Sequence, residues 1–196
     1  MRIISGRLKN LKLTIPAKAK IRPTSERLRE ALFSALGPSV HGVDALDLFA
    51  GSGALGIEAL SRGAKSVTLV EREPRLARNL MRLRSSLESS QAVEVLNMDA
   101  LKSVDYLSRR NTTFDLIFLD PPYDTDWIWQ LLSNETFLSL VSPAGLVVVE
   151  RAGSDKDLDF DEGYKLERIF SRKYGSSRLE IFSSVNSELS LYLESC

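Results

Sequence analysis

The chain has 196 residues, of which 43% are hydrophobic and 27% charged, so it can bury one substantial core and has the composition of an ordinary globular protein. Its first residues, MRIISGRLKNLK, hold no apolar run of signal-peptide length, and no segment offers the roughly 20 apolar residues of a membrane span. We therefore expect one main domain in a cytoplasmic protein with no membrane partner.

Cysteine and histidine usage narrows the chemistry. The one cysteine is the last residue, Cys196, and the one histidine is His41, which we place in a surface linker. This usage excludes a disulfide framework and a cysteine metal site and argues against a zinc site. We expect no metal.

Charge is distributed unevenly, although the formal net charge is zero. Residues 1–30 hold nine Lys or Arg against two Glu. Such asymmetry suggests an anionic partner for the basic part of the chain. A basic arm that is simply solvated would carry the same charge, so charge alone leaves both interpretations open.

Residues 1–40 form a basic extension with its own elements. Residues 2–16 are typical of two short strands around Gly6 and Asn10, and a helix is expected to start with Thr24 as its N-cap. Helical spacing predicts that this helix buries one face and leaves Arg27, Arg29 and Glu30 on the other. The apolar residues of the buried face are Leu28, Ala31, Leu32, Ala35 and Leu36.

Residues 41–184 alternate short apolar runs with helical patterns. A helix over residues 54–62 ends at Gly63, another opens at Pro74, and the turn Ser142-Pro143-Ala144 leads into the fifth apolar run. This alternation predicts right-handed βαβ crossovers and a mostly parallel sheet with helices on both faces. The strand-like runs are residues 43–50, 66–71, 92–99, 114–120 and 145–150.

The end of the chain breaks this rhythm. Residues 164–175 and 177–184 are two strand-like runs separated by a short turn, which predicts a hairpin and an antiparallel end to a seven-stranded sheet. Residues 185–196 are Ser-rich and are expected to form a loosely attached tail. The predicted fold class is α/β.

A glycine-rich stretch follows the first strand. Residues 51–56 spell Gly-x-Gly-x-x-Gly, and Glu71 stands 20 positions after Gly51, as in the fingerprint of a dinucleotide site. A nicotinamide-binding oxidoreductase would carry this pattern. Any adenosine-bearing cofactor that backbone approaches closely needs similar glycines, so the spelling alone does not decide the cofactor.

The fourth strand ends in the quartet Asp120-Pro121-Pro122-Tyr123. Two prolines stiffen the loop and leave its carbonyls available as acceptors. Asp120 and the Pro121 carbonyl could accept both hydrogens of an exocyclic amine while Tyr123 stacks on the base, which would aim the nitrogen lone pair at an electrophilic methyl group. A proline-rich turn with Tyr123 as packing is the structural alternative.

These motifs resemble a known family. DLFAGSGALGIEAL followed by DPPY resembles the S-adenosylmethionine-dependent amino-methyltransferases of the seven-stranded Rossmann-like class. With RIISGRLKNLKLTIP and RPTSERLREALFSAL before them, they resemble the RsmD family, bacterial enzymes that methylate the guanine-N2 amine of one nucleotide in 16S ribosomal RNA. The resemblance covers roughly residues 2–150, and the Ser-rich tail departs from it.

The resemblance implies a cofactor site for S-adenosylmethionine, with S-adenosylhomocysteine as product. It places Glu71 on the ribose hydroxyls and Asp99 near the adenine, although Asp99 would serve equally as a helix N-cap. The loop after the first strand would wrap the methionine part of the cofactor. The loop residues carried over are Asp47, Phe49, Gly51 and Gly53. Gly56 would then be a helix residue that packs against the sheet.

The resemblance also implies a partner, 16S ribosomal RNA or the assembling small ribosomal subunit. We expect the protein to act as a monomer. The base must leave its stack to reach Asp120. Trp127 and Trp129 follow the loop and could flank that base, although packing is the simpler role. The residues expected to hold RNA phosphates are Arg2, Arg7, Lys9, Lys12, Arg22 and Arg27.

Rival functions remain at this stage. Adenine-N6 methylation of DNA or RNA uses the same quartet, and protein glutamine methyltransferases usually begin it with Asn where this chain has Asp120. A nicotinamide-dependent oxidoreductase and a non-catalytic RNA-binding protein belong to other classes. The latter would have little need for Asp-Pro-Pro-Tyr.

Overall fold

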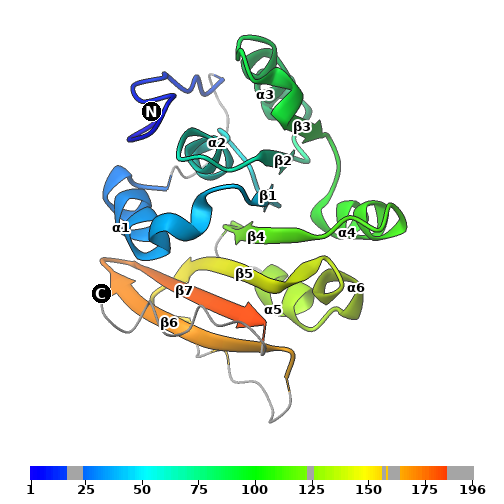
Figure 1. The fold of residues 1–196 in the computed structure, drawn as a ribbon. Helices are drawn as coiled ribbons and strands as arrows, with labels where there is room; N and C mark the ends of the chain where they lie inside the picture. The colour runs from blue at the N-terminus through cyan, green and yellow to red at the C-terminus, as the bar shows by residue number, and fades with distance from the viewer. Residues whose placement is uncertain (17–23, 123–125, 156–157, 159–163, 185–196) are drawn as a thin grey trace.

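The computed structural model describes residues 1–16, 24–122, 126–155, 158 and 164–184 (Figure 1). These residues form a seven-stranded sheet in the order β3-β2-β1-β4-β5-β7-β6. The strands are β1 (Asp44–Asp47), β2 (Ser66–Val70), β3 (Val93–Leu96), β4 (Phe114–Leu119), β5 (Val141–Ala152), β6 (Leu166–Tyr174) and β7 (Ser177–Ser184).

Strands β1 to β5 pair in parallel, whereas β7 pairs antiparallel with both β5 and β6. The predicted sheet, mostly parallel with an antiparallel last strand, is confirmed. The hairpin does not simply extend the sheet in chain order, because β7 lies between β5 and β6.

Helices cover both faces of the sheet (Figure 1). Successive strand residues point to opposite faces, so Ala45 joins one core cluster and Leu46 the other. The first cluster includes residues of α1, α2 and α3, and the second includes residues of α4, α5 and α6. The helices are α1 (Glu26–Leu36), α2 (Ala54–Ser61), α3 (Pro74–Ser85), α4 (Ala100–Arg109), α5 (Trp127–Leu132) and α6 (Glu135–Leu138), with short 3-10 turns at Gly37–Val40 and Ser90–Ala92.

Strand β5 begins earlier than its apolar run. The predicted turn Ser142-Pro143-Ala144 belongs to the strand, where the pairing partner of Phe114 is Val141 and that of Leu116 is already Leu146. The sequence pattern could not predict this bulge because Pro143, which has no backbone N–H, signals a turn and an irregular strand equally.

The N-terminal extension pairs more sparsely than two regular strands would. An isolated antiparallel bridge joins Arg2 to Lys12, and the N–H of Ile3 donates to the carbonyl of Leu11 at 3.0 Å. Both predicted turn residues have positive φ, 81° at Gly6 and 70° at Asn10. The segment is therefore a loose hairpin whose turns lie where the sequence placed them.

Helix α1 begins one residue later than expected. Ser25, not Thr24, is its N-cap, and the Ser25 hydroxyl accepts a hydrogen bond from the N–H of Leu28 at 3.1 Å. Both residue types cap helices well, so local preference could not separate the two neighbours. The hydroxyl of Thr24 is used elsewhere, as described below.

Arg29 was expected on the exposed face of α1, and this prediction is wrong. Its side chain is fully buried, forms an ion pair with the buried Glu58 of α2 at 3.5 Å, and donates to the carbonyl of Arg2 at 3.0 Å. Burial lowers the pKa of Arg29, although the charge of Glu58 opposes the shift. Helical periodicity misplaces this residue because α1 is covered on a second side by the N-terminal segment.

Glu58 fixes the N-terminal segment to α2. Its carboxylate accepts from the backbone N–H of Ile4 at 2.7 Å and of Ser5 at 3.1 Å, and from Arg62 at 2.8 Å. Ile3 and Leu13 of the same segment are buried in the cluster that contains α1 and α2. The extension therefore shares a core with the sheet and with helices α2 and α3.

No helix in the described ranges combines the length and the apolar character that a membrane span requires.

Candidate active site

The acids that the sequence singled out lie at the carboxyl ends of adjacent strands. Asp47 is the last residue of β1, Glu71 follows β2 and Asp120 follows β4. These strands are neighbours in the order β2-β1-β4, and parallel neighbours bring their carboxyl ends to one edge. The chain order reverses between β1 and β4, which is where open α/β sheets bind ligands.

The loop after β1 uses two of its glycines for backbone shape. Gly51 and Gly53 have positive φ values of 52° and 81°, a conformation that side chains disfavour. A Cβ at Gly53 would also lie 2.8 Å from Leu80 of α3. The tight turn brings loop backbone to the edge of the sheet beside Glu71.

Gly56 has a different role, as predicted. It lies in α2, where an added Cβ would overlap Leu69 and come within 2.8 Å of Val67, both in β2. The third glycine therefore allows the helix to pack closely on the sheet.

Asp47 is buried beneath the loop, with 2% of its surface exposed. Its carboxyl oxygens accept from the N–H of Gly56 at 3.2 Å and from that of Phe49 at 3.4 Å. Burial raises the pKa of Asp47 to about 7, the hydrogen bond from Gly56 opposes that shift, and the nearby charges of Asp120 and Glu71 add to it. Asp47 therefore holds the loop backbone in place through these two hydrogen bonds from within the core.

Glu71 ties the glycine loop to β2. Its carboxylate accepts from the N–H of Gly51 at 2.9 Å and from the N–H of Glu73 at 2.7 Å. Asn97, after β3, donates to the carbonyl of Glu71 at 2.8 Å and so holds the turn from the other side. The sequence gives no sign of this role for Asn97, because a single Asn after a strand has no distinctive pattern.

Asp99 is the N-cap of α4, and its side chain accepts from the N–H of Leu101 at 3.1 Å. The helix-cap alternative is therefore confirmed. The capping contact uses Oδ1, and a carboxylate can accept at both oxygens.

Asp120 is half-buried at the start of the quartet, followed by the buried Pro121 and the exposed Pro122. The hydroxyl of Thr24 donates to Oδ2 of Asp120 at 2.6 Å, across 96 positions of sequence. The local sequence predicts a helix-cap role for Thr24 and gives no sign of this contact. Tyr123 lies outside the described residues.

Two aromatic rings lie beside the loop. Phe49 and Trp127 are in edge contact, with ring centroids 5.9 Å apart and an interplanar angle of 63°. This contact confirms a packing role for Trp127, against a residue of the glycine loop. Trp129 is 50% exposed.

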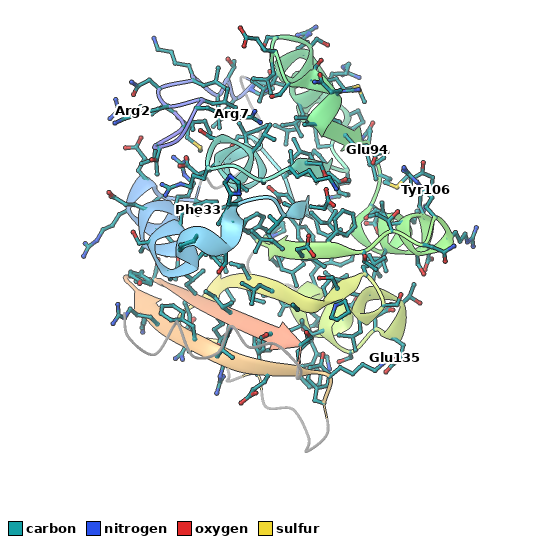
Figure 2. All side chains as sticks on the ribbon, in the orientation of Figure 1. Arg2, Arg7, Phe33, Glu94, Tyr106 and Glu135 are labelled. Atoms are coloured by element: carbon teal, nitrogen blue, oxygen red, sulfur yellow. The ribbon has the colours of Figure 1, made fainter. Side chains whose placement is uncertain are left out.

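The predicted phosphate-binding residues lie on the surface of the extension. Arg2 and Arg7 project from the N-terminal segment (Figure 2), and Arg2 forms an ion pair with Glu26 at 3.2 Å. The remaining exposed residues of this set are Lys9, Lys12 and Arg27. Arg22 lies outside the described ranges. The described part of the chain contains no group of three His, Cys, Asp or Glu side chains that could hold a metal ion.

The sequence is similar to a known family and to proteins that have been named. A family model described as "Conserved hypothetical protein 95" matches residues 1–183. The Haemophilus influenzae protein named Ribosomal RNA small subunit methyltransferase D is 38% identical over 169 residues, which covers 85% of this chain and 86% of that protein.

Solved structures show the same fold. The Thermus thermophilus hypothetical protein TTHA0928 superimposes with a TM-score of 0.71 at 31% identity, covering 92% of this chain and 98% of that one. The protein SMU.776, complexed with SAH, gives a TM-score of 0.57 at 19% identity, covering 80% of this chain and 48% of that one, and this likeness shows the fold alone. Because the family model spans nearly the whole described chain, the protein belongs to the Conserved hypothetical protein 95 family, the RsmD family that its motifs indicate.

Proposed function

We propose that this protein is an S-adenosylmethionine-dependent methyltransferase of the exocyclic N2 amine of a guanine in 16S ribosomal RNA. The observation that carries the proposal is the position of Asp120, directly after β4 and beside the acids that end β1 and β2. The name of the Haemophilus relative supports ribosomal RNA of the small subunit as the substrate. We further propose that the protein acts as a cytoplasmic monomer, on naked RNA or on an assembling subunit.

The residues at the sheet edge fit S-adenosylmethionine, which supplies a methyl group on a positively charged sulfonium. Glu71 accepts two backbone hydrogen bonds, and a carboxylate has about four acceptor sites, so it can also accept from two ribose hydroxyls. Gly51 and Gly53 let loop backbone approach the ligand closely. The acids that raise the pKa of Asp47 also create a negative potential that favours a cation.

The other cofactor contacts are proposals on the same footing. The loop from Asp47 through Phe49 would surround the methionine part, with Asp47 acting through the backbone it holds. Asp99 keeps Oδ2 for the adenine amine while Oδ1 caps α4.

The reacting amine would be held by the quartet. Asp120 and the Pro121 carbonyl accept its two hydrogens, and Pro122 keeps the loop stiff. Holding both hydrogens directs the nitrogen lone pair away from these acceptors and toward the methyl donor. Tyr123 would stack on the base, and stacking worth about 1 to 3 kcal/mol offsets much of the cost of unstacking it.

Thr24 links the extension to this chemistry. Its hydroxyl holds Oδ2 of Asp120, which restricts the rotation of the carboxylate that receives the amine. The basic extension thus lies beside the site it would serve. The residues proposed to hold RNA phosphates there are Arg2, Arg7, Lys9, Lys12, Arg22 and Arg27.

A methyl-transfer assay tests the proposal directly. Purified protein with labelled S-adenosylmethionine is offered 16S ribosomal RNA, small-subunit particles or duplex DNA, and the modified nucleoside is identified by mass spectrometry. We expect N2-methylguanine from the ribosomal substrates. N6-methyladenine, or transfer to DNA alone, would replace the proposal with the adenine alternative, and calorimetric binding of NAD rather than S-adenosylmethionine would replace it with the oxidoreductase.

The variant Asp120→Ala sharpens this test. It removes the proposed acceptor of the amine hydrogens while leaving Glu71 and the glycine loop intact, so transfer should fall by about 100-fold or more with calorimetric affinity for S-adenosylmethionine nearly unchanged. Glu71→Ala is the matched comparison, because it should weaken cofactor binding instead. Transfer by Asp120→Ala at the wild-type rate would refute the role of the quartet.

A further inference from the structure

An exposed row of arginines runs along α3. Arg75, Arg78 and Arg82 are separated by three and four positions, which places them on one face of the helix. All three side chains are exposed, whereas Leu76, Ala77 and Leu80 form the buried face. Within the described part of the chain, no carboxylate forms an ion pair with any of the three.

The basic extension lies against the same helix. The side-chain amide of Asn79 donates to the carbonyl of Thr14 at 2.6 Å. A surface hollow of about 300 Å³ lies between the two elements, and Lys12 from the extension and Arg82 from α3 both line it. The neutral residues Thr14, Asn79 and Ser86 complete its polar lining, and the lining contains no acid.

The chemistry of this surface fits a polyanion. Two cations from separate elements line one hollow, and Arg78 and Arg75 continue the positive charge along α3 toward its N-terminus. Arg75 to Arg82 spans about 10 Å at 1.5 Å of rise per residue. Phosphates of a nucleic acid backbone, which repeat along a strand, match such a row better than a single small anion does.

One end of the row lies close to the candidate active site, so the polyanion that would reach both is the RNA substrate. Helix α3 begins at Pro74, three residues after Glu71, so Arg75 lies close to the candidate active site and Arg82 farther from it. We propose that Arg75, Arg78 and Arg82, together with Lys12, form a second contact surface for the RNA backbone, which holds the strand that flanks the target nucleotide. This inference rests on the proposed function and adds to it the arginines of α3, which continue the basic surface of the extension.

The test compares two charge-reversal pairs in the full chain. Arg78→Glu with Arg82→Glu changes the proposed surface. Lys102→Glu with Arg109→Glu makes the same change in net charge on α4, where both residues are exposed and which packs on the opposite face of the sheet. Binding of a fluorescent 16S ribosomal RNA transcript is measured by anisotropy between 50 and about 200 mM salt.

We expect the α3 pair to weaken RNA binding about tenfold or more at about 100 mM salt and to reduce the salt slope by about 1.4 to 1.8, because each of the two lost phosphate contacts contributes about 0.7 to 0.9. The α4 pair should differ little from wild type. Equal effects of the two pairs, or weakened binding to anionic lipid vesicles with unchanged RNA binding, would overturn the inference.

Methyl transfer, measured alongside, separates this inference from the proposed function. In the α3 pair the KM for RNA should rise with kcat nearly unchanged. Wild-type protein that binds the transcript through this surface but transfers no methyl group would refute the function and leave the surface standing. If wild-type protein transfers methyl groups normally and the α3 pair behaves like the α4 pair, the proposed function stands and the proposed surface is refuted.

Discussion

Asp47 holds a carboxyl group where water cannot reach it and where two other acids are near. Its pKa of about 7 lies well above the ordinary aspartate value of 3.8, so between these two pH values the unfolded chain ionises while the folded protein keeps the proton. The free energy of unfolding therefore falls as the pH rises through this range, by at most about 1.4 kcal/mol per pH unit, and the loss is complete above about pH 7.

Asp47→Asn should remove this dependence. Wild type should lose free energy of unfolding between pH 5 and 7 relative to the variant, in urea titrations at each pH, and gain none back up to pH 8. Asp44→Asn is the control. Burial alone would raise the pKa of Asp44, but the hydrogen bonds from Ser66 and Lys65 and the charge of Lys65 together outweigh burial and lower it, so Asp44 titrates below this window. A constant difference between wild type and Asp47→Asn across the range would show that Asp47 is ionised throughout.

The hydrogen bond from Thr24 to Asp120 leads to a second prediction at the residue scale. If its hydroxyl orients Asp120, Thr24→Val should lower kcat for methyl transfer about tenfold, as expected for a hydrogen bond of about 1.5 kcal/mol to a charged group, with the affinities for S-adenosylmethionine and RNA little changed. Thr24→Ser retains the hydroxyl and should restore kcat. A Ser variant as slow as the Val variant would assign Thr24 a packing role instead.

At the scale of elements, the sequence predicts what depends on local pattern. The strand-like runs, the glycine turns at Gly51 and Gly53, and the packing of Gly56 follow from periodicity and backbone preference, and the structure contains them. The order of β6 and β7 in the sheet does not follow, because a hairpin can add to β5 through either strand.

The missed features depend on contacts between distant segments. Arg29 reads as a surface residue until the N-terminal segment covers α1 and Glu58 supplies a partner. Thr24 and Ser25 are equivalent caps until Asp120, 96 positions away, takes the first hydroxyl. The structure brings Asp47, Glu71 and Asp120 to one edge of the sheet, as the motifs predict, whereas the hydrogen bonds that fix their orientation could not be predicted from local pattern.

The N-terminal segment packs closely against α2, and two matched glycine variants can measure how much this contact contributes to the free energy of unfolding. Gly6 has φ 81°, and a Cβ there would overlap the Ser61 carbonyl, which accepts from the N–H of Arg7 at 2.8 Å. Gly42 has a similar φ of 78° with nothing within 4 Å of an added Cβ. Both Ala variants carry the backbone strain, but only Gly6→Ala must lift the segment from α2.

We therefore expect Gly42→Ala to cost about 1 to 2 kcal/mol of the free energy of unfolding, and Gly6→Ala to cost clearly more. Gly6→Ala should also become sensitive to proteolysis within residues 1–16, since the bonds from Ile4 and Ser5 to Glu58 would be disturbed. Equal losses in the two variants would mean that the segment shifts without leaving the helix.

At the scale of the whole molecule, the extension and the sheet act as one body. The buried side chains of the extension share a core cluster with β1, β2 and β4. If the N-terminal segment detached, the buried charge of Glu58 would lose its backbone hydrogen-bond partners. The basic surface of the extension and the Asp120 carboxylate therefore keep a fixed relation, and an RNA substrate has to adapt its shape to both.

The place of β7 in the sheet also orders events during synthesis. A nascent chain that has emerged only as far as β6 lacks the strand that pairs with β5 over residues 146–152. The edge of β5, whose side chains are largely buried in the finished protein, then exposes unpaired backbone groups on an apolar strand, which favours association with other chains. Release of the last strand from the ribosome closes that edge, so premature termination before residue 177 should yield aggregates rather than a smaller working enzyme.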